Sequence, residues 1–389
     1  MTWELGGGYG HLGRLASLAA PLKAAGHEVV FAVRDTKIAE KLLSGTGIPV
    51  RQAPALTMEQ QVEMASFGQI LMHNCFNEAV QAKARTRGWR DLYAEIQPDL
   101  IVADHSPTSL LAARGLGIRC ITVGTGFLIP PDLTPLPNLR TWENIAPAKL
   151  AQDETQALAV MNQVLESLGQ PPLARVSQLY DFCSKVFFTL RELDFYAAVR
   201  PPGTEYLGPA FLNTGKAPVW PAGSGKRVFV YLRPFKTLPS LLESLRATAC
   251  PTLVHIANVN PEFRARFDGS NVAFSEEPLD MLQVARECDL AIHLGGHGVL
   301  APVLLAGKPQ LLMPAHLEMM VHSLAATQLG AALIALERKP LGMQHKLKRL
   351  LEEPAFSEAA RRFAERYADL KVEKIPERFA RQVERILAH

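Results

Sequence analysis

The sequence predicts an α/β protein made of two domains, each built around a parallel sheet. Its 389 residues are enough for two domains of ordinary size. Short apolar runs that are typical of buried strands alternate with helical segments in both halves of the chain. A glycine-rich turn follows an apolar run twice, once near the start and once after residue 292. Strands that alternate with helices favour parallel sheets with right-handed crossovers.

In the first half, the strands expected from apolar runs cover residues 1–5, 28–33, 100–103 and 120–124. Helices are expected over residues 12–24, most of 58–96, and 107–116. Only five residues precede the first glycines, and a buried strand normally has about five or six. We therefore expect this sequence to begin partway into its first strand.

Residues 200–226 are rich in proline and glycine, which is the composition of a linker. We place the first domain at 1–205, the linker at 206–226, the second domain at 227–375 and a terminal helix, expected to pack back on the first domain, at 376–389. Strands of the second domain are expected over 228–232, 252–256, 272–274, 290–292 and 310–313. A ligand is expected in a cleft between the domains, at the carboxyl ends of the strands.

Composition excludes several classes of protein. The net charge of +3 is too small to argue for nucleic-acid binding. The five cysteines are scattered, without a Cys-x-x-Cys motif or a Cys/His cluster, so neither a disulfide framework nor a zinc site is indicated. Reduced thiols favour the cytoplasm. No apolar run approaches the roughly 20 residues of a membrane span.

The second glycine-rich turn, residues 293–298, lies where an apolar strand gives way to a helix. A helix start presents unpaired N–H groups and the positive end of the helix dipole, and glycines let a phosphate approach them. Gly295, Gly296 and Gly298 therefore predict a diphosphate site, the alternative being an ordinary tight turn. His297 is the expected phosphate contact. His293 either joins it or is the inward-facing last residue of the strand.

Two further residues of the second half are candidates for ligand binding. Glu318 follows a strand and a proline, where a carboxylate could accept hydrogen bonds from sugar hydroxyls. A solvated or helix-capping acid is the alternative. Arg233 follows the strand at 228–232 and points either into the cleft or, as surface arginines usually do, to solvent.

In the first half, His11 and Asp104 are the candidate catalytic residues. His11 begins the first helix, and an imidazole can take a proton from a hydroxyl near neutral pH. Asp104 ends a neighbouring strand, where a carboxylate could fix the tautomer of His11 and stabilise its imidazolium. The alternatives are a loop-packing histidine and a helix N-cap aspartate.

These fragments resemble those of GT-B glycosyltransferases, the large family that contains the UDP-glucuronosyl and natural-product glycosyltransferases. The resemblance covers nearly the whole chain. In the first half it rests on Gly8-Tyr9-Gly10-His11 followed by Arg14 and Leu15, and on residues 25–29 and 98–104. In the second half it rests on residues 288–292, Gly295-Gly296, residues 306–309, and Pro314 with Glu318.

The resemblance implies two Rossmann-like domains facing across a cleft, the first binding the acceptor and the second the donor. It implies a metal-independent, inverting transfer of a hexose-type sugar from a nucleotide diphosphate, UDP or TDP, to a hydroxyl of a small or lipid-like acceptor, with no cofactor. His11 would match the family's base and Asp104 its partner. The glycine loop would hold the diphosphate, and Glu318 would contact the sugar. Gly10 and Phe127 would lie on the acceptor side, and a peripheral membrane contact is left open.

The donor side also departs from the family pattern. Leu294 stands where a histidine is usual, Val299 where a hydroxyl is usual, and Pro302 where a glutamate often contacts the ribose. Met319 replaces a glutamine and His322 an asparagine. Each change removes a polar contact worth on the order of 1 kcal/mol. The alternative is therefore a non-catalytic binding or partner protein of the same fold, and a third hypothesis is a sugar-nucleotide epimerase of that fold.

Overall fold

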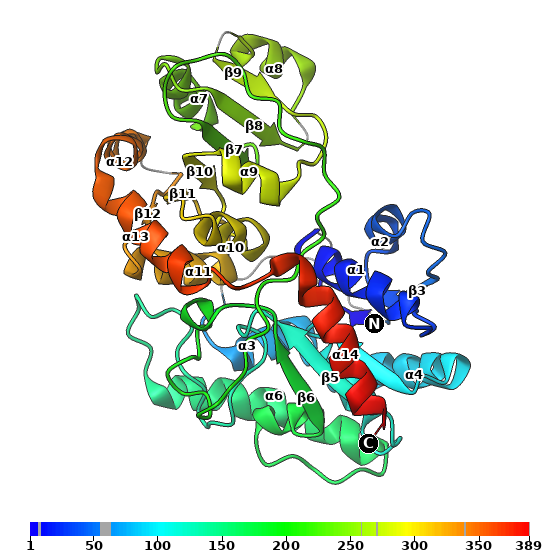
Figure 1. Cartoon of the computed structure of the whole chain (residues 1–389). Helices are drawn as coiled ribbons and strands as arrows, with labels where there is room; N and C mark the ends of the chain where they lie inside the picture. Colours follow the sequence, from blue (N-terminus) through cyan, green and yellow to red (C-terminus); the bar gives the residue numbers. More distant parts are fainter. Residues whose placement is uncertain (7–8, 55–63, 258, 270, 338–339, 389) are drawn as a thin grey trace. The chain divides into compact units, whose positions relative to one another are not determined.

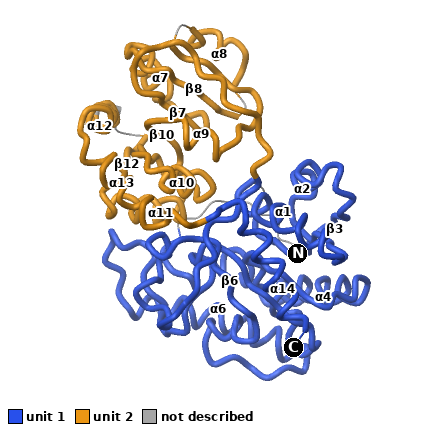
Figure 2. Tube along the Cα trace, viewed as in Figure 1, with its two compact units in different colours: residues 1–212, 371–389 blue, residues 213–370 orange. Residues whose placement is uncertain are grey.

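The chain forms two compact units in the computed structural model, which describes residues 1–6, 9–54, 64–257, 259–269, 271–337 and 340–388. Residues 1–212 and 371–389 make up the first unit, and residues 213–370 the second (Figure 2). The chain first passes between the units within the predicted linker, 206–226, and it returns to the first unit just before the C-terminal helix.

The first unit contains a six-stranded sheet whose strands are all parallel (Figure 1). Its strands are β1 (Thr2–Trp3), β2 (Phe31–Val33), β3 (Val50–Gln52), β4 (Leu100–Ala103), β5 (Arg119–Gly124) and β6 (Cys183–Phe187). The order across the sheet is β3-β2-β1-β4-β5-β6, so the winding changes direction between β1 and β4. In sheets of this kind, ligands bind outside the carboxyl ends of the strands at that switch point.

The helices of the first unit surround this sheet. They are α1 (Tyr9–Ala24), α2 (Thr36–Leu42), α3 (Phe67–Asn74), α4 (Ala79–Ile96), α5 (Pro107–Ala113), α6 (Pro147–Ser167) and α14 (Ile375–Ala388), with short 3-10 turns at Val176–Tyr180, Arg191–Leu193 and Val372–Lys374. The C-terminal α14 packs against α1 (Figure 1). It does so because Ile375, Phe379 and Val383 recur every four residues and form one buried apolar face.

Several predicted elements differ from the observed ones. The strand expected over 28–33 begins only at Phe31, and the helix expected over 107–116 ends at Ala113. The helical stretch expected over 58–96 consists of α3 and α4, and its first residues, 58–63, lie outside the described residues, as does Gly8 of the quoted motif. The two edge strands β3 and β6 were not predicted. Strand β3 has only three residues, of which Arg51 and Gln52 are exposed, and in β6 the exposed Ser184 and half-buried Lys185 interrupt the apolar run.

The second unit repeats the same topology. Its strands are β7 (Val228–Leu232), β8 (Thr252–Ile256), β9 (Val272–Phe274), β10 (Leu290–His293), β11 (Gln310–Leu312) and β12 (Ala332–Ile334), and β12 was not predicted. They are all parallel, in the order β12-β11-β10-β7-β8-β9, so the switch point lies between β7 and β10. The predicted pair of α/β units with parallel sheets is therefore confirmed.

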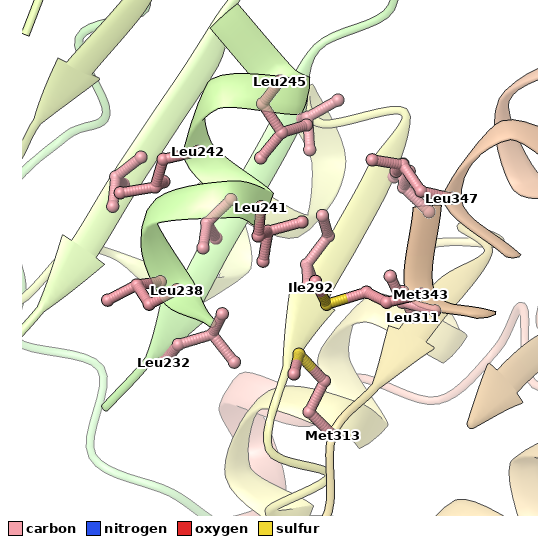
Figure 3. Close-up of a cluster of buried hydrophobic side chains, with 14 of the residues drawn as sticks. Leu232, Leu238, Leu241, Leu242, Leu245, Ile292, Leu311, Met313, Met343 and Leu347 are labelled. Atoms are coloured by element: carbon pink, nitrogen blue, oxygen red, sulfur yellow. The ribbon is translucent and has the colours of Figure 1, made fainter. Parts of the chain in front are cut away.

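Both faces of this second sheet are buried. The helices that accompany it are α7 (Leu238–Arg246), α8 (Pro261–Phe267), α9 (Met281–Glu287), α10 (His297–Leu305), α11 (Leu317–Gln328), α12 (Pro340–Glu352) and α13 (Pro354–Arg366). Val228 and Val230 of β7 face α7 and α12, whereas Phe229 faces α9 and α10, as the two-residue period of a strand requires. Figure 3 shows part of the cluster on the side of α7 and α12, including Leu241 and Leu245 of α7, Ile292 of β10 and Met343 of α12. Burying each such side chain stabilises the unit by about 1.5–3 kcal/mol.

Candidate functional site

The two predicted catalytic residues lie together at the switch point of the first unit. His11 is in the first turns of α1, just after β1, and Asp104 directly follows β4. His11 Nδ1 is 3.0 Å from Asp104 Oδ1, and the Nη1 of Arg14 donates to Asp104 Oδ2 at 2.7 Å. His11 and Arg14 are three residues apart on one helix, which places both on the same face. One carboxylate thus joins an imidazole and a guanidinium.

The burial of the three side chains differs in a way that suits proton transfer. The side chain of Asp104 is 1% exposed and that of Arg14 is 6% exposed, whereas that of His11 is 22% exposed. A buried carboxylate is tolerated only when it is paired and hydrogen-bonded. Arg14 supplies that pairing, while the imidazole that Asp104 orients reaches the surface.

Trp3, the last residue of β1, fixes the plane of the His11 ring. The two rings are stacked, with centroids 3.8 Å apart and planes 9° apart. The indole is itself buried, and its N–H donates to the carbonyl of Gly6 at 2.6 Å. Sequence reasoning missed Trp3, and it quoted Arg14 only as part of a motif. The available signal was an aromatic residue three positions before the first glycine of the turn.

The two residues predicted on the acceptor side differ in accessibility. Gly10 is exposed, and a Cβ atom added there would meet no other atom within 4 Å among the described residues. Phe127, in the loop after β5, is buried and belongs to the core of the first unit. Their roles in acceptor binding stay predictions.

The glycine loop of the second unit connects β10 to α10. Gly296 is the N-cap of α10, and His297 is its first residue. Gly295 has a φ of +82°, and a Cβ atom there would lie 2.3 Å from Ser323 Oγ and 3.0 Å from the carbonyl of Met319. Only glycine fits this position, so the loop approaches α11 closely. The predicted strand–loop–helix arrangement is therefore present, and the first turn of α10 presents its N–H groups as helix starts do.

His293 is held inside this unit at the end of β10. Its Nε2 is 2.6 Å from Gln310 Oε1, and its Nδ1 accepts the N–H of Gly295 at 3.1 Å. Burial lowers the pKa of His293 to about 4, so the ring is neutral at physiological pH. Of the two interpretations of His293 from sequence, the structure matches the inward-facing last residue of the strand.

The other predicted donor-side residues are scattered around the loop. His297 is buried, with its ring 5.3 Å from that of His322 in an edge-on arrangement. Glu318 and Met319 are half-buried in the first turn of α11, and the Cε of Met319 lies 3.7 Å from the place where a Cβ of Gly296 would be. Arg233 follows β7 but is 51% exposed and pairs with Glu337 at 3.0 Å, which matches the surface alternative.

Leu294, Val299 and Pro302 are the three residues that differ from the pattern of the family that this sequence resembles. Leu294 packs against the cluster around α7, Val299 lies in the cluster between the sheet and α9, and Pro302 is buried inside α10. Gly298 is the second residue of α10. All three side chains are apolar and pack within the second unit.

Across the described parts of the chain, no group of three or more His, Cys, Asp or Glu side chains could hold a metal ion. All five cysteines are free thiols and are buried. No helix among the described residues is both long and apolar enough to cross a membrane.

Comparisons with known proteins agree with this architecture. Residues 270–385 match the family model of the erythromycin biosynthesis protein CIII-like C-terminal domain. No curated protein sequence matches the chain. Three similar solved structures each cover nearly the whole chain at low sequence identity.

The first is the glycotransferase of kitacinnamycin, with 19% identity, a TM-score of 0.70, and 96% of this chain and 95% of that one covered. The second is the glycosyltransferase SsfS6 of Streptomyces sp. SF2575 complexed with thymidine diphosphate, with 18% identity, a TM-score of 0.61, and 96% and 95% covered. The third is the spinosyn rhamnosyltransferase SpnG complexed with spinosyn aglycone, with 16% identity, a TM-score of 0.66, and 98% and 99% covered. The resemblance to glycosyltransferases is confirmed: the chain has the GT-B fold of these structures, and residues 270–385 match the EryCIII-like C-terminal domain.

Proposed function

We propose that the protein is a glycosyltransferase that moves a sugar from a nucleoside diphosphate to a hydroxyl group of a small acceptor. The observation that carries the proposal is the 3.0 Å contact between His11 Nδ1 and Asp104 Oδ1 at the switch point of the first unit. A fold kept only for binding would need no buried carboxylate behind a partly exposed imidazole.

In the proposed mechanism, His11 is the general base. With Nδ1 directed at Asp104, Nε2 takes the proton of the acceptor hydroxyl as its oxygen attacks the anomeric carbon of the sugar. Asp104 fixes the tautomer and stabilises the imidazolium, while stacked Trp3 limits rotation of the ring. Attack opposite the leaving diphosphate inverts the anomeric configuration. A positioned base of this kind contributes about 10²–10⁴ to the rate.

The donor is proposed to bind at the glycine loop of the second unit. The N–H groups at the start of α10 and the dipole of that helix would stabilise the charge that grows on the departing diphosphate, which is a task otherwise given to a cation. Glu318, in the first turn of α11, would accept hydrogen bonds from sugar hydroxyls. We propose TDP or UDP as the nucleotide, since the structure of the glycosyltransferase SsfS6, which is similar to this chain, was solved with thymidine diphosphate. Five free thiols fit a reducing compartment, the cytoplasm.

A thermal-shift panel tests this donor site. TDP, UDP, ADP and GDP are added at equal concentrations. TMP, which lacks the second phosphate, and inorganic phosphate, which lacks the nucleoside, are the controls. Binding at 100 times Kd adds about 2.7 kcal/mol to the stability, so a true ligand raises the melting temperature clearly. We expect TDP or UDP to do so, with no change on adding EDTA. The absence of a shift with every nucleoside diphosphate would overturn the donor assignment.

The second candidate is a non-catalytic binding protein of the same fold. Its supporting observation is the apolar packing of Leu294, Val299 and Pro302, where polar donor contacts are usual in the family that this sequence resembles. This alternative predicts no sugar transfer and no functional consequence of removing the His11 imidazole. The acceptor-dependent release of nucleoside diphosphate separates the two candidates.

A further inference from the structure

We infer that His293 is a positioning residue of the donor loop, whose Nδ1 holds the N–H of Gly295 and so sets the backbone conformation from which α10 begins. It would not touch the donor itself. The consequence for donor binding rests on the proposed function. The contacts that define the role lie within the second unit and require no ligand.

The hydrogen-bond network fixes the tautomer of His293. The amide nitrogen of Gln310 donates to the carbonyl of Leu300 at 3.3 Å, which directs the amide oxygen towards His293. That oxygen is an acceptor 2.6 Å from His293 Nε2, so Nε2 carries the ring hydrogen. Nδ1 is left as the acceptor, and it faces the Gly295 N–H at 3.1 Å. Only this arrangement of the ring hydrogen and the amide group gives each donor in the network an acceptor.

The residue held by this network is the one on which the loop geometry depends. Gly295 is left-handed, with a φ of +82°, and it packs against Ser323 and the Met319 carbonyl of α11. Gly296, the N-cap of α10, comes next in the chain. A shift of Gly295 would therefore move both the N–H groups at the start of α10 and the contact with the helix that carries Glu318.

His293 is also unsuited to bind a diphosphate directly. It is 1% exposed, and both ring nitrogens are used within the protein. Burial lowers its pKa to about 4, so it brings no positive charge to the loop at neutral pH. A protonated ring would carry a hydrogen on Nδ1 and would repel the Gly295 N–H that it now accepts.

Two substitutions separate the role of each ring nitrogen. In His293→Asn the side-chain amide occupies the place of Cγ and Nδ1, so its oxygen can still accept the Gly295 N–H. In His293→Gln the amide extends towards Gln310 and leaves no acceptor at the Nδ1 position. We expect the Kd for TDP to stay within about threefold of wild type for His293→Asn and to rise at least tenfold for His293→Gln. Equal weakening in both variants would contradict the positioning role and favour direct contact with the donor.

Measurements without nucleotide keep the inference testable if the proposed function fails. Hydrogen exchange of the Gly295 amide should be slow in wild type and His293→Asn and fast in His293→Gln. In wild type, ¹⁵N spectra of the imidazole should show the Nε2–H tautomer at pH 7. An Nδ1–H tautomer, or a Gly295 amide equally protected in both variants, overturns the inference. A wild type that shows the expected tautomer and protection but binds no nucleoside diphosphate contradicts only the proposed function.

Discussion

Arg14 and His11 occupy different oxygens of one carboxylate: Arg14 Nη1 lies 2.7 Å from Asp104 Oδ2, while His11 Nδ1 lies 3.0 Å from Oδ1. The negative charge that steadies the imidazolium is therefore partly offset by a buried guanidinium. Because Arg14 also pairs with Asp104 inside the unit, it should support both the stability of the fold and the position of the carboxylate that orients His11.

Replacing Arg14 with Met should change both properties. Removing one partner of a buried ion pair costs about 3 kcal/mol, seen as a lower urea midpoint. The carboxylate that orients His11 also loses the guanidinium that holds its second oxygen, so kcat/KM should fall. The matched control is Arg51→Met, which removes an exposed pair with Glu95 and should cost less than about 1 kcal/mol with no change of kcat/KM. An unchanged urea midpoint and an unchanged kcat/KM in Arg14→Met would contradict the shared-carboxylate account.

Gly295→Ala should disrupt the donor loop. The left-handed backbone and the contact with Ser323 and the Met319 carbonyl together should cost about 3 kcal/mol and weaken TDP binding. Gly26→Ala is the control for backbone strain alone, because Gly26 has a φ of +91° with open space around its Cβ position, and it should cost only about 1 kcal/mol. Denaturant unfolding and calorimetric titration with TDP measure the two effects. Equal costs in the two variants would show that close packing against α11 is unimportant.

The depressed pKa of His293 predicts a pH-dependent stability. Its folded value of about 4 lies below the ordinary 6.5, so between these pH values the unfolded chain binds a proton that the folded chain does not. Stability is therefore lost as the pH falls from 6.5 towards 4, by roughly 3 kcal/mol in all. Urea midpoints measured from pH 7.5 to pH 4.5 should fall more steeply for wild type than for His293→Asn. Parallel curves for the two proteins would show that the pKa of His293 is the same in the folded and unfolded chain, which would contradict the prediction.

The sequence predicted much of the fold because buried parallel strands are nearly continuous apolar runs between glycines and prolines. The edge strands β3, β6 and β12 were missed, since Ser184 and Lys185 break the pattern in β6, and β3 and β12 have only three residues each. Residues 100–103 and 290–292 are fully apolar central segments, and they were placed correctly.

The candidate site was partly predictable because its two main residues follow predicted strands. Asp104 and His11 follow strands that proved to be neighbours, so their convergence follows from the ends of parallel strands meeting at one edge. Trp3 and Gln310 could not be assigned roles, because their partners depend on side-chain packing rather than on position along a strand. The direction of His293 is not predictable for a related reason, because strand ends look alike in sequence whether their last side chain points to a ligand or into the core.

The most direct test of the central claim measures acceptor-dependent release of nucleoside diphosphate by wild type and His11→Ala. Both proteins are incubated with TDP- and UDP-sugars and a panel of hydroxylated small molecules, and TDP binding is measured in parallel by calorimetry. We expect wild type to release TDP or UDP with a matching glycoside product, and His11→Ala to bind TDP normally but to lose transfer by about 10²-fold or more. Transfer by His11→Ala at the wild-type rate would contradict the assignment of His11 as the base.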